Sequence, residues 1–76
     1  MKLRQVRSNV TELTIGETTI MFSYQTPVAG YDDHGAFRTG QHYSVTTSRQ
    51  INQYLGGKEV GRTVSQDYIN SLVEVA

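Results

Sequence analysis

Two aspartates and two histidines in the middle of the chain have the side-chain chemistry of a divalent-metal site. Asp32, Asp33 and His34 share one turn, and His42 follows on the returning segment. Imidazole and carboxylate groups both bind divalent metals, so this cluster is the candidate for a metal-dependent enzyme. Its spacing matches no metal-binding motif, however, and aspartate is frequent in turns because its side chain bonds to nearby backbone. We therefore expect no metal and no cofactor.

Other patterns that support catalysis are missing from the sequence. A nucleophile needs a base and an orienting group within hydrogen-bond reach, and no serine or threonine stands in a glycine-flanked elbow. The chain has no cysteine. Gly56-Gly57-Lys58 follows a helical pattern rather than preceding one, so it is typical of a helix end and not of a phosphate-binding loop. We expect that the protein is not an enzyme.

Nucleic-acid binding is the second hypothesis. Lys2, Arg4 and Arg7 could form a basic edge, to which Arg38 adds a further charge. Such an interface depends on contacts with phosphates, and the formal net charge of the chain is zero. Lysine and arginine on an edge strand also protect a sheet from aggregation. We therefore expect that nucleic acid is not the partner.

Aromatic residues favour a protein partner. Tyr31, Phe37 and Tyr43 lie with Arg38 in an irregular hairpin, and exposed aromatic and arginine side chains are enriched at protein interfaces. The alternative, that this hairpin folds its aromatics onto its own sheet, stays open. Tyr24, Tyr54 and Tyr68 instead fall on apolar faces and are interpreted as core residues.

The fold that must position these residues is predicted to be α+β. Alternation of apolar and polar residues predicts a small antiparallel β-meander of four to five strands within about residues 3–45. The candidate strands are residues 3–8, 11–15, 18–25, 28–31 and a last strand of residues 36–39 that continues at 42–45 after a break at Gly40-Gln41. Gly16-Glu17 suits a type II′ hairpin turn, and Pro27 suits a strand start or an edge.

Two C-terminal α-helices are predicted at about residues 47–55 and 65–75. Thr47 with Gln50 forms a capping box at the start of the first helix, and Gly56-Gly57 ends it. Residues 58–63 are a charged connection, after which Ser65 caps the second helix. Because the sheet is interpreted as having one apolar face, both helices are expected to pack on that face.

Length and composition limit the remaining choices. The 76 residues form a single domain, and a neutral domain this small is expected to associate with a protein partner or as a homodimer. The lack of cysteine fits a reducing compartment. No apolar run approaches the roughly 20 residues needed to cross a bilayer, and no signal peptide is recognised. We therefore expect no membrane partner and a cytoplasmic location.

Several segments carry a family resemblance. They are Ser23 to Ala29 (SYQTPVA), Arg38-Thr39, Tyr43 to Thr47 (YSVTT), and Ile51-Asn52 with Leu55. Together, over roughly residues 4–55, they resemble a family of small uncharacterised proteins encoded by tailed bacteriophages and some bacteria. No activity is attached to the family. The resemblance implies a phage accessory protein that acts inside a bacterial host cell.

The sequence thus favours a small non-enzymatic protein-binding module, a phage accessory protein that contacts a host protein. Its candidate interface is Tyr31, Phe37, Arg38 and Tyr43. The alternative is a nucleic-acid-binding protein that uses the basic edge, and the third hypothesis is the metal-dependent enzyme around His34 and His42.

Overall fold

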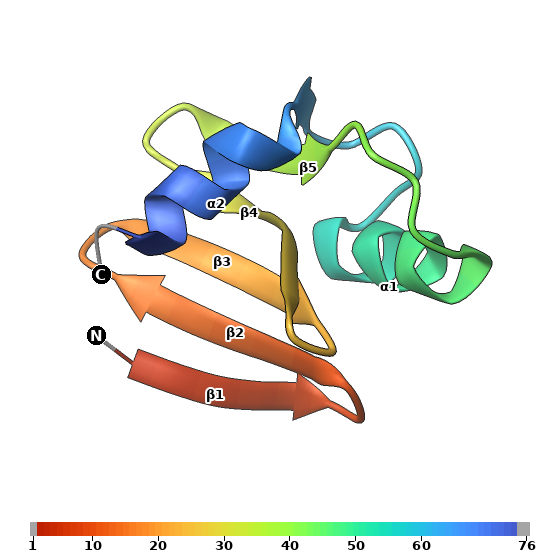
Figure 1. Cartoon of the computed structure of the whole chain (residues 1–76), viewed down its shortest axis with the longest axis horizontal. Helices are drawn as coiled ribbons and strands as arrows, with labels where there is room; N and C mark the ends of the chain where they lie inside the picture. Colours follow the sequence, from red (N-terminus) through yellow and green to blue (C-terminus); the bar gives the residue numbers. More distant parts are fainter. Residues whose placement is uncertain (1, 75–76) are drawn as a thin grey trace.

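The computed structural model describes residues 2–74, in which a six-stranded sheet carries one helix on each face. The strands follow one another across the sheet in chain order: β1 (Lys2–Arg7), β2 (Val10–Ile15), β3 (Thr18–Ser23), β4 (Thr26–Asp32), β5 (Gly35–Thr39) and β6 (Arg62–Val64). The first five strands form an antiparallel meander (Figure 1). β6 runs parallel to β5, and the chain between them contains α1 (Val45–Leu55). The predicted α+β class is confirmed, with more strands than expected.

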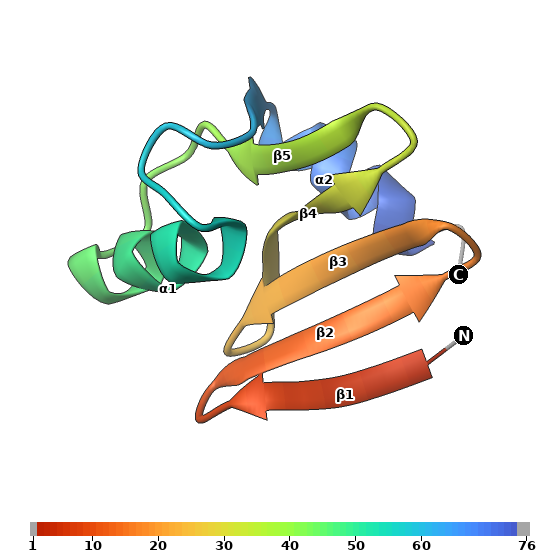
Figure 2. The ribbon, with the colours of Figure 1, turned by 180° about the vertical axis from the view of Figure 1, so that it is seen from behind.

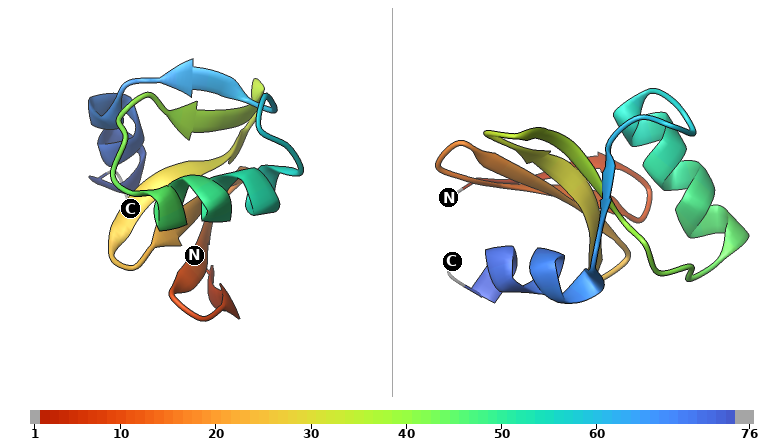
Figure 3. Two further views of the ribbon diagram at one scale, coloured as in Figure 1. Left: turned by 90° about the vertical axis from the view of Figure 1, so that its right-hand side faces the viewer. Right: turned by 90° about the horizontal axis from the view of Figure 1, so that it is seen from above.

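Each helix covers its own face of the sheet. On the first face, which we call the α1 face, Ile51 and Leu55 of α1 join a buried cluster with Met21 and Ala29. On the opposite α2 face, Ile69 of α2 (Gln66–Glu74) is buried against strand residues Ile20 and Phe37. Figure 3 shows the two helices on opposite sides of the sheet.

The prediction that both helices pack on one face is therefore wrong. Residues 62 and 63, interpreted as the end of the charged connection 58–63, form β6 together with Val64 instead. The chain passes over the α1 face to reach this strand, and α2 begins directly after it on the other side. Ile20 and Met21 are neighbours on β3, point to opposite faces and are both fully buried. Both faces of β3 must therefore be shielded from water, and each helix covers one of them.

The hairpin and helix-end signals in the sequence are largely confirmed. Gly16 has φ +59° and lies with Glu17 between the paired residues Ile15 and Thr18, as a type II′ turn requires. Gly56 ends α1 with φ +91°. The Ser65 hydroxyl accepts a hydrogen bond from the Tyr68 backbone N–H at 3.1 Å, which caps α2. Residue 75 of the expected second helix lies outside the described residues.

The start of α1 differs from the prediction. Ser44 rather than Thr47 is the N-cap, and its hydroxyl accepts a hydrogen bond from the Thr47 backbone N–H at 3.1 Å. Thr47 is buried, and its hydroxyl lies 3.1 Å from that of Ser23 on β3. Gln50 also bonds to Ser23 instead of reaching back to a cap. Residues 42–45 are accordingly not a strand, because the helix already begins at Val45.

The outer hairpin, formed by β1 and β2, lies at the margin of the sheet and meets α1 through side chains: Val6 packs against the cluster of Ile51 and Leu55, and Arg7 donates a hydrogen bond to Gln53. α1 packs over β3 and β4, and α2 packs over β4. Figures 1 and 2 show β1 at the margin of the sheet. Within residues 2–74 neither helix has the length and apolar character needed to cross a bilayer.

Candidate functional site

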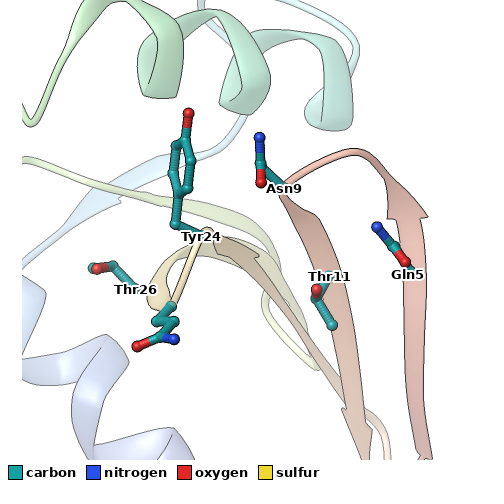
Figure 4. Close-up of a pocket in the computed structure, with 6 residues that line it drawn as sticks. Gln5, Asn9, Thr11, Tyr24 and Thr26 are labelled. Atoms are coloured by element: carbon teal, nitrogen blue, oxygen red, sulfur yellow. The ribbon is translucent and has the colours of Figure 1, made fainter.

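A groove beside the outer hairpin is the candidate functional site on the described surface. Two adjoining hollows, of about 660 and about 260 Å³, share Thr11, Tyr24 and Gln25. We call their union the outer groove; its other lining residues are Leu3, Gln5, Asn9, Phe22 and Thr26. Figure 4 shows Gln5 and Thr11 on neighbouring strands, with Tyr24 and Asn9 close together at the turn end of the groove. The groove therefore takes lining residues from four neighbouring strands, β1 to β4, and from the turns that join them.

Two turn residues at this end hold an unusual backbone conformation. Asn9 has φ +64° and Tyr24 has φ +59°, the two non-glycine residues with positive φ in the described chain. The Tyr24 backbone N–H donates a hydrogen bond of 2.8 Å to the Asn9 carbonyl, which ties the two turns together. Asparagine adopts this conformation readily, whereas a bulky side chain there costs roughly 1–2 kcal/mol. Strain of this kind concentrates at functional sites.

Apolar surface is exposed at the same place. Leu3 is 69% exposed and Tyr24 is 57% exposed. Phe22, half-buried, lines the smaller hollow together with them. Large apolar side chains grouped on an uncovered surface are typical of a contact site for another molecule.

The lining residues offer binding chemistry. Side-chain amides and hydroxyls donate and accept hydrogen bonds, and the Leu3, Phe22 and Tyr24 side chains supply apolar contact. The residues that line the outer groove include no carboxylate, imidazole, lysine or arginine. This arrangement suits recognition of a neutral or apolar segment rather than proton transfer.

The aromatics proposed from the sequence do not form one surface. Phe37 is fully buried under α2, so it is removed from the candidate interface: it points to the α2 face and packs edge-on against Tyr68, with ring centroids 6.1 Å apart. Tyr31, on the α1 face, is 39% exposed and packs against Tyr54 at 5.8 Å. Tyr43, 40% exposed, precedes α1. The open alternative, a hairpin aromatic folded onto its own sheet, is what Phe37 shows.

Arg38 has a structural role at its position on β5. Its guanidinium donates hydrogen bonds to the carbonyls of Gly57 at 2.7 Å and Val60 at 2.9 Å, and to the Asn52 side chain at 2.9 Å. These contacts fasten the segment between α1 and β6 to the sheet.

The basic residues and the histidines are also separated. Lys2, Arg4 and Arg7 lie together on β1, but β2, β3 and β4 stand between them and Arg38. His34 lies in the turn before β5, and His42 follows the other end of that strand. Residues 2–74 contain no group of three or more metal-ligating side chains.

The shifted pKa values belong to two polar networks that join the helices to the sheet. Burial and the hydrogen bond to Glu12 raise the pKa of the Tyr54 phenol above its ordinary value. Burial alone would raise the pKa of Asp32, but hydrogen bonds from Arg62, Tyr68 and the His34 backbone, with the Arg62 charge, lower it overall. Both networks connect elements far apart in the sequence, and neither borders the outer groove.

Sequence reasoning missed the outer groove. Tyr24 was assigned to a strand with its ring in the core, whereas β3 ends at Ser23 and Tyr24 lies exposed in the following turn. Leu3 was assigned to a strand without a surface role. The available signal was the weak alternation of residues 3–8, which leaves a leucine on a strand with few apolar neighbours on its face.

These observations define a small α+β protein with an exposed groove at one margin of its sheet. Residues 1–71 match the model of a family of unknown function, DUF8033, and the chain belongs to this family. The match covers residues 4–55 and continues into α2, and the phage origin implied by the resemblance stays a prediction. The comparisons with curated proteins and with solved structures find no match.

Proposed function

We propose that this protein is a small non-enzymatic binding module that contacts a protein partner through the outer groove. The observation that carries the proposal is the exposure of Leu3 and Tyr24 on a part of the sheet that neither helix covers. Aromatic and apolar side chains at the centre of a contact supply most of its binding free energy. The positive φ of Tyr24 supports the same function, because this conformation is unfavourable for a bulky residue and the Tyr24 ring is exposed instead of buried in the core.

The resemblance to tailed-phage proteins supports a more specific proposal. We propose that the protein is a phage accessory protein that binds a host protein in the bacterial cytoplasm. The alternative is that the same surface binds a second copy of the chain and forms a homodimer. Small accessory proteins of this gene class commonly act by binding, which is an analogy and not a property of the fold.

Affinity capture from a bacterial lysate, with and without nuclease, tests the proposal. The tagged wild-type protein is compared with a Leu3→Ser/Tyr24→Ser double variant, and with Tyr43→Ser as the matched control. Tyr43 is similarly exposed but lies outside the outer groove. We expect a nuclease-resistant protein partner that is retained by Tyr43→Ser and lost by the double variant.

Three results would overturn the proposal. Loss of the partner with Tyr43→Ser but not with the double variant would move the surface to the segment before α1. Recovery that disappears after nuclease treatment would favour the nucleic-acid hypothesis. A partner retained by both variants would exclude the outer groove.

A further inference from the structure

The outer groove runs beside a free edge of the sheet. β1 is the terminal strand and pairs with β2 on one side. From Lys2 to Gln5 this pairing is regular, and a bulge follows between Gln5 and Arg7. Alternate backbone N–H and C=O groups of such an edge point away from the sheet, where they can pair with another extended chain. The regular segment that is open to pairing is therefore Lys2 to Gln5.

The two faces of this segment differ in chemistry. Lys2 and Arg4 pair with Thr14 and Glu12 and lie on the α1 face, because side chains alternate along a strand. Leu3 and Gln5 lie on the α2 face and line the outer groove. An added strand would meet positive charge on one of its faces and an open, partly apolar groove on the other.

The charge of this edge indicates which kind of extended chain can pair with it. No acidic residue occurs in residues 1–11, which hold Lys2, Arg4 and Arg7. Among residues 2–74, the one carboxylate paired with β1 is that of Glu12, which lies 3.0 Å from Arg4 and also accepts a hydrogen bond from Tyr54. The edge therefore keeps an excess of positive charge although the whole chain is neutral.

A second copy of the chain is a poor occupant of this edge. Symmetric antiparallel pairing about Lys2 or Arg4 puts that residue opposite its own copy, and pairing about Leu3 puts Lys2 opposite Arg4. Each of these three registers places two positive charges directly across from one another, which is destabilising. Pairing about Gln5 would have to cross the bulge between Gln5 and Arg7. An acidic strand avoids this repulsion and gains attraction at the same positions.

We infer that β1 binds an extended acidic segment of a partner protein by strand addition. The segment has the pattern acidic–apolar–acidic: its acidic side chains lie opposite Lys2 and Arg4, and its apolar side chain lies opposite Leu3 and enters the outer groove. This inference rests on the proposed function and adds the chemistry of the partner. Backbone hydrogen bonds give the affinity, and alternating side chains give the specificity.

Fluorescence polarisation with synthetic peptides tests the inference. The probe is a fluorescein-labelled peptide with Glu-Val-Glu between Gly-Ser flanks, and its control has Lys-Val-Lys. We expect saturable binding of the acidic probe that weakens with added salt, and at least about tenfold weaker binding of the basic one. Lys2→Glu should weaken binding of the acidic probe, whereas Lys58→Glu, an exposed lysine after α1, should leave it unchanged.

Backbone methylation separates strand addition from simple charge attraction. One version of the acidic probe carries N-methyl groups at odd positions and another at even positions. In a strand only one of these sets faces β1, so we expect one version to lose binding by about tenfold or more and the other to keep it. Equal binding of the two versions would overturn strand addition.

The peptide and capture experiments fail in different ways. If no probe binds saturably at low salt while the Leu3→Ser/Tyr24→Ser variant still loses its captured partner, strand addition is wrong and the proposed function stands. If the probes bind as expected but the captured partner survives the double variant, the edge binds acidic strands and the outer groove is not the protein-contact surface.

Discussion

The Tyr54 hydroxyl on α1 donates a 2.6 Å hydrogen bond to Glu12 on β2, while Arg4 on β1 holds the other oxygen of that carboxylate at 3.0 Å. One carboxylate thus joins the helix to the two strands of the outer hairpin. Tyr54→Phe removes the hydroxyl and keeps the ring packing. A hydrogen bond to a charged group contributes about 1.5–3 kcal/mol, so we expect the free energy of unfolding in urea to fall by about that amount. Tyr43→Phe, at an exposed tyrosine, is the control, and equal losses in the two variants would contradict this role.

The network around Asp32 predicts a loss of stability in acid. The Asp32 side chain is 5% exposed and accepts hydrogen bonds from Arg62 at 2.6 Å and from Tyr68 at 2.9 Å. Its folded-state pKa lies below the ordinary value of 3.8, so the ionised form stabilises the fold above that pH. This stabilisation is lost as the pH falls through the lower, folded-state pKa.

Urea unfolding as a function of pH measures this effect. Asp32→Asn should lower the unfolding midpoint at neutral pH, and its difference from wild type should shrink at pH values below 3.8. Asp33→Asn, at the exposed neighbour in the same turn, is the matched control. A difference between Asp32→Asn and wild type that stays constant with pH would show that the charge of Asp32 is unimportant.

Gly30 marks a close approach between neighbouring strands. A Cβ atom placed there would lie 2.1 Å from the Thr19 carbonyl oxygen and 2.8 Å from the Phe37 ring. The first of these atoms is backbone and cannot rotate away, so Gly30→Ala must shift β3 or β4. We expect a loss of about 2–3 kcal/mol in the free energy of unfolding. Gly40→Ala, where the nearest atom is a threonine methyl group at 3.0 Å, should cost clearly less; equal costs would contradict the close approach.

Local signals in the sequence predicted the elements that local chemistry determines. The alternation around Gly16 gave the β2–β3 hairpin, and Ser65 gave the start of α2, because turns and caps are decided within a few residues. Thr47 shows the limit of this reasoning. It fits a cap by sequence, but its hydroxyl is used in the contact with Ser23, and Ser44 becomes the cap.

The rest of the fold depends on contacts that no local pattern contains. β6 has three residues, and its strand character comes from parallel pairing with β5 across the whole of α1. That pairing places the helices on separate faces. The outer groove follows from the same arrangement, because Leu3 and Tyr24 are exposed only where neither helix reaches. For the aromatic residues of the candidate interface, the sequence does not show which face of the sheet each side chain lies on. Phe37 lies under α2, whereas Tyr31 lies on the α1 face.

We expect Arg38 to stabilise the connection between α1 and β6 and not to form part of a binding surface. Its forked guanidinium bonds to two carbonyls of this connection at once, a geometry that lysine cannot reproduce. Arg38→Met should therefore speed amide hydrogen exchange in residues 57–61 and lower the free energy of unfolding by about 1.5–3 kcal/mol. Arg38→Lys should restore only part of the protection. Arg49→Met, at an exposed position on α1, is the control, and similar exchange in both methionine variants would contradict the role of the fork.

Tyr24 allows binding and stability to be separated. Its φ of +59° is unfavourable for a bulky side chain, whereas asparagine accepts it, as Asn9 does in the adjacent turn. Tyr24→Asn should therefore raise the free energy of unfolding by about 0.5–1 kcal/mol while it removes the exposed ring from the outer groove. Thermal unfolding and affinity capture on the same preparation measure the two effects. A variant that is more stable but captures less partner would show that Tyr24 is retained for binding at a cost in stability. A variant that is less stable would show instead that the ring stabilises the turn, and the strain at Tyr24 would then give no support to a binding role.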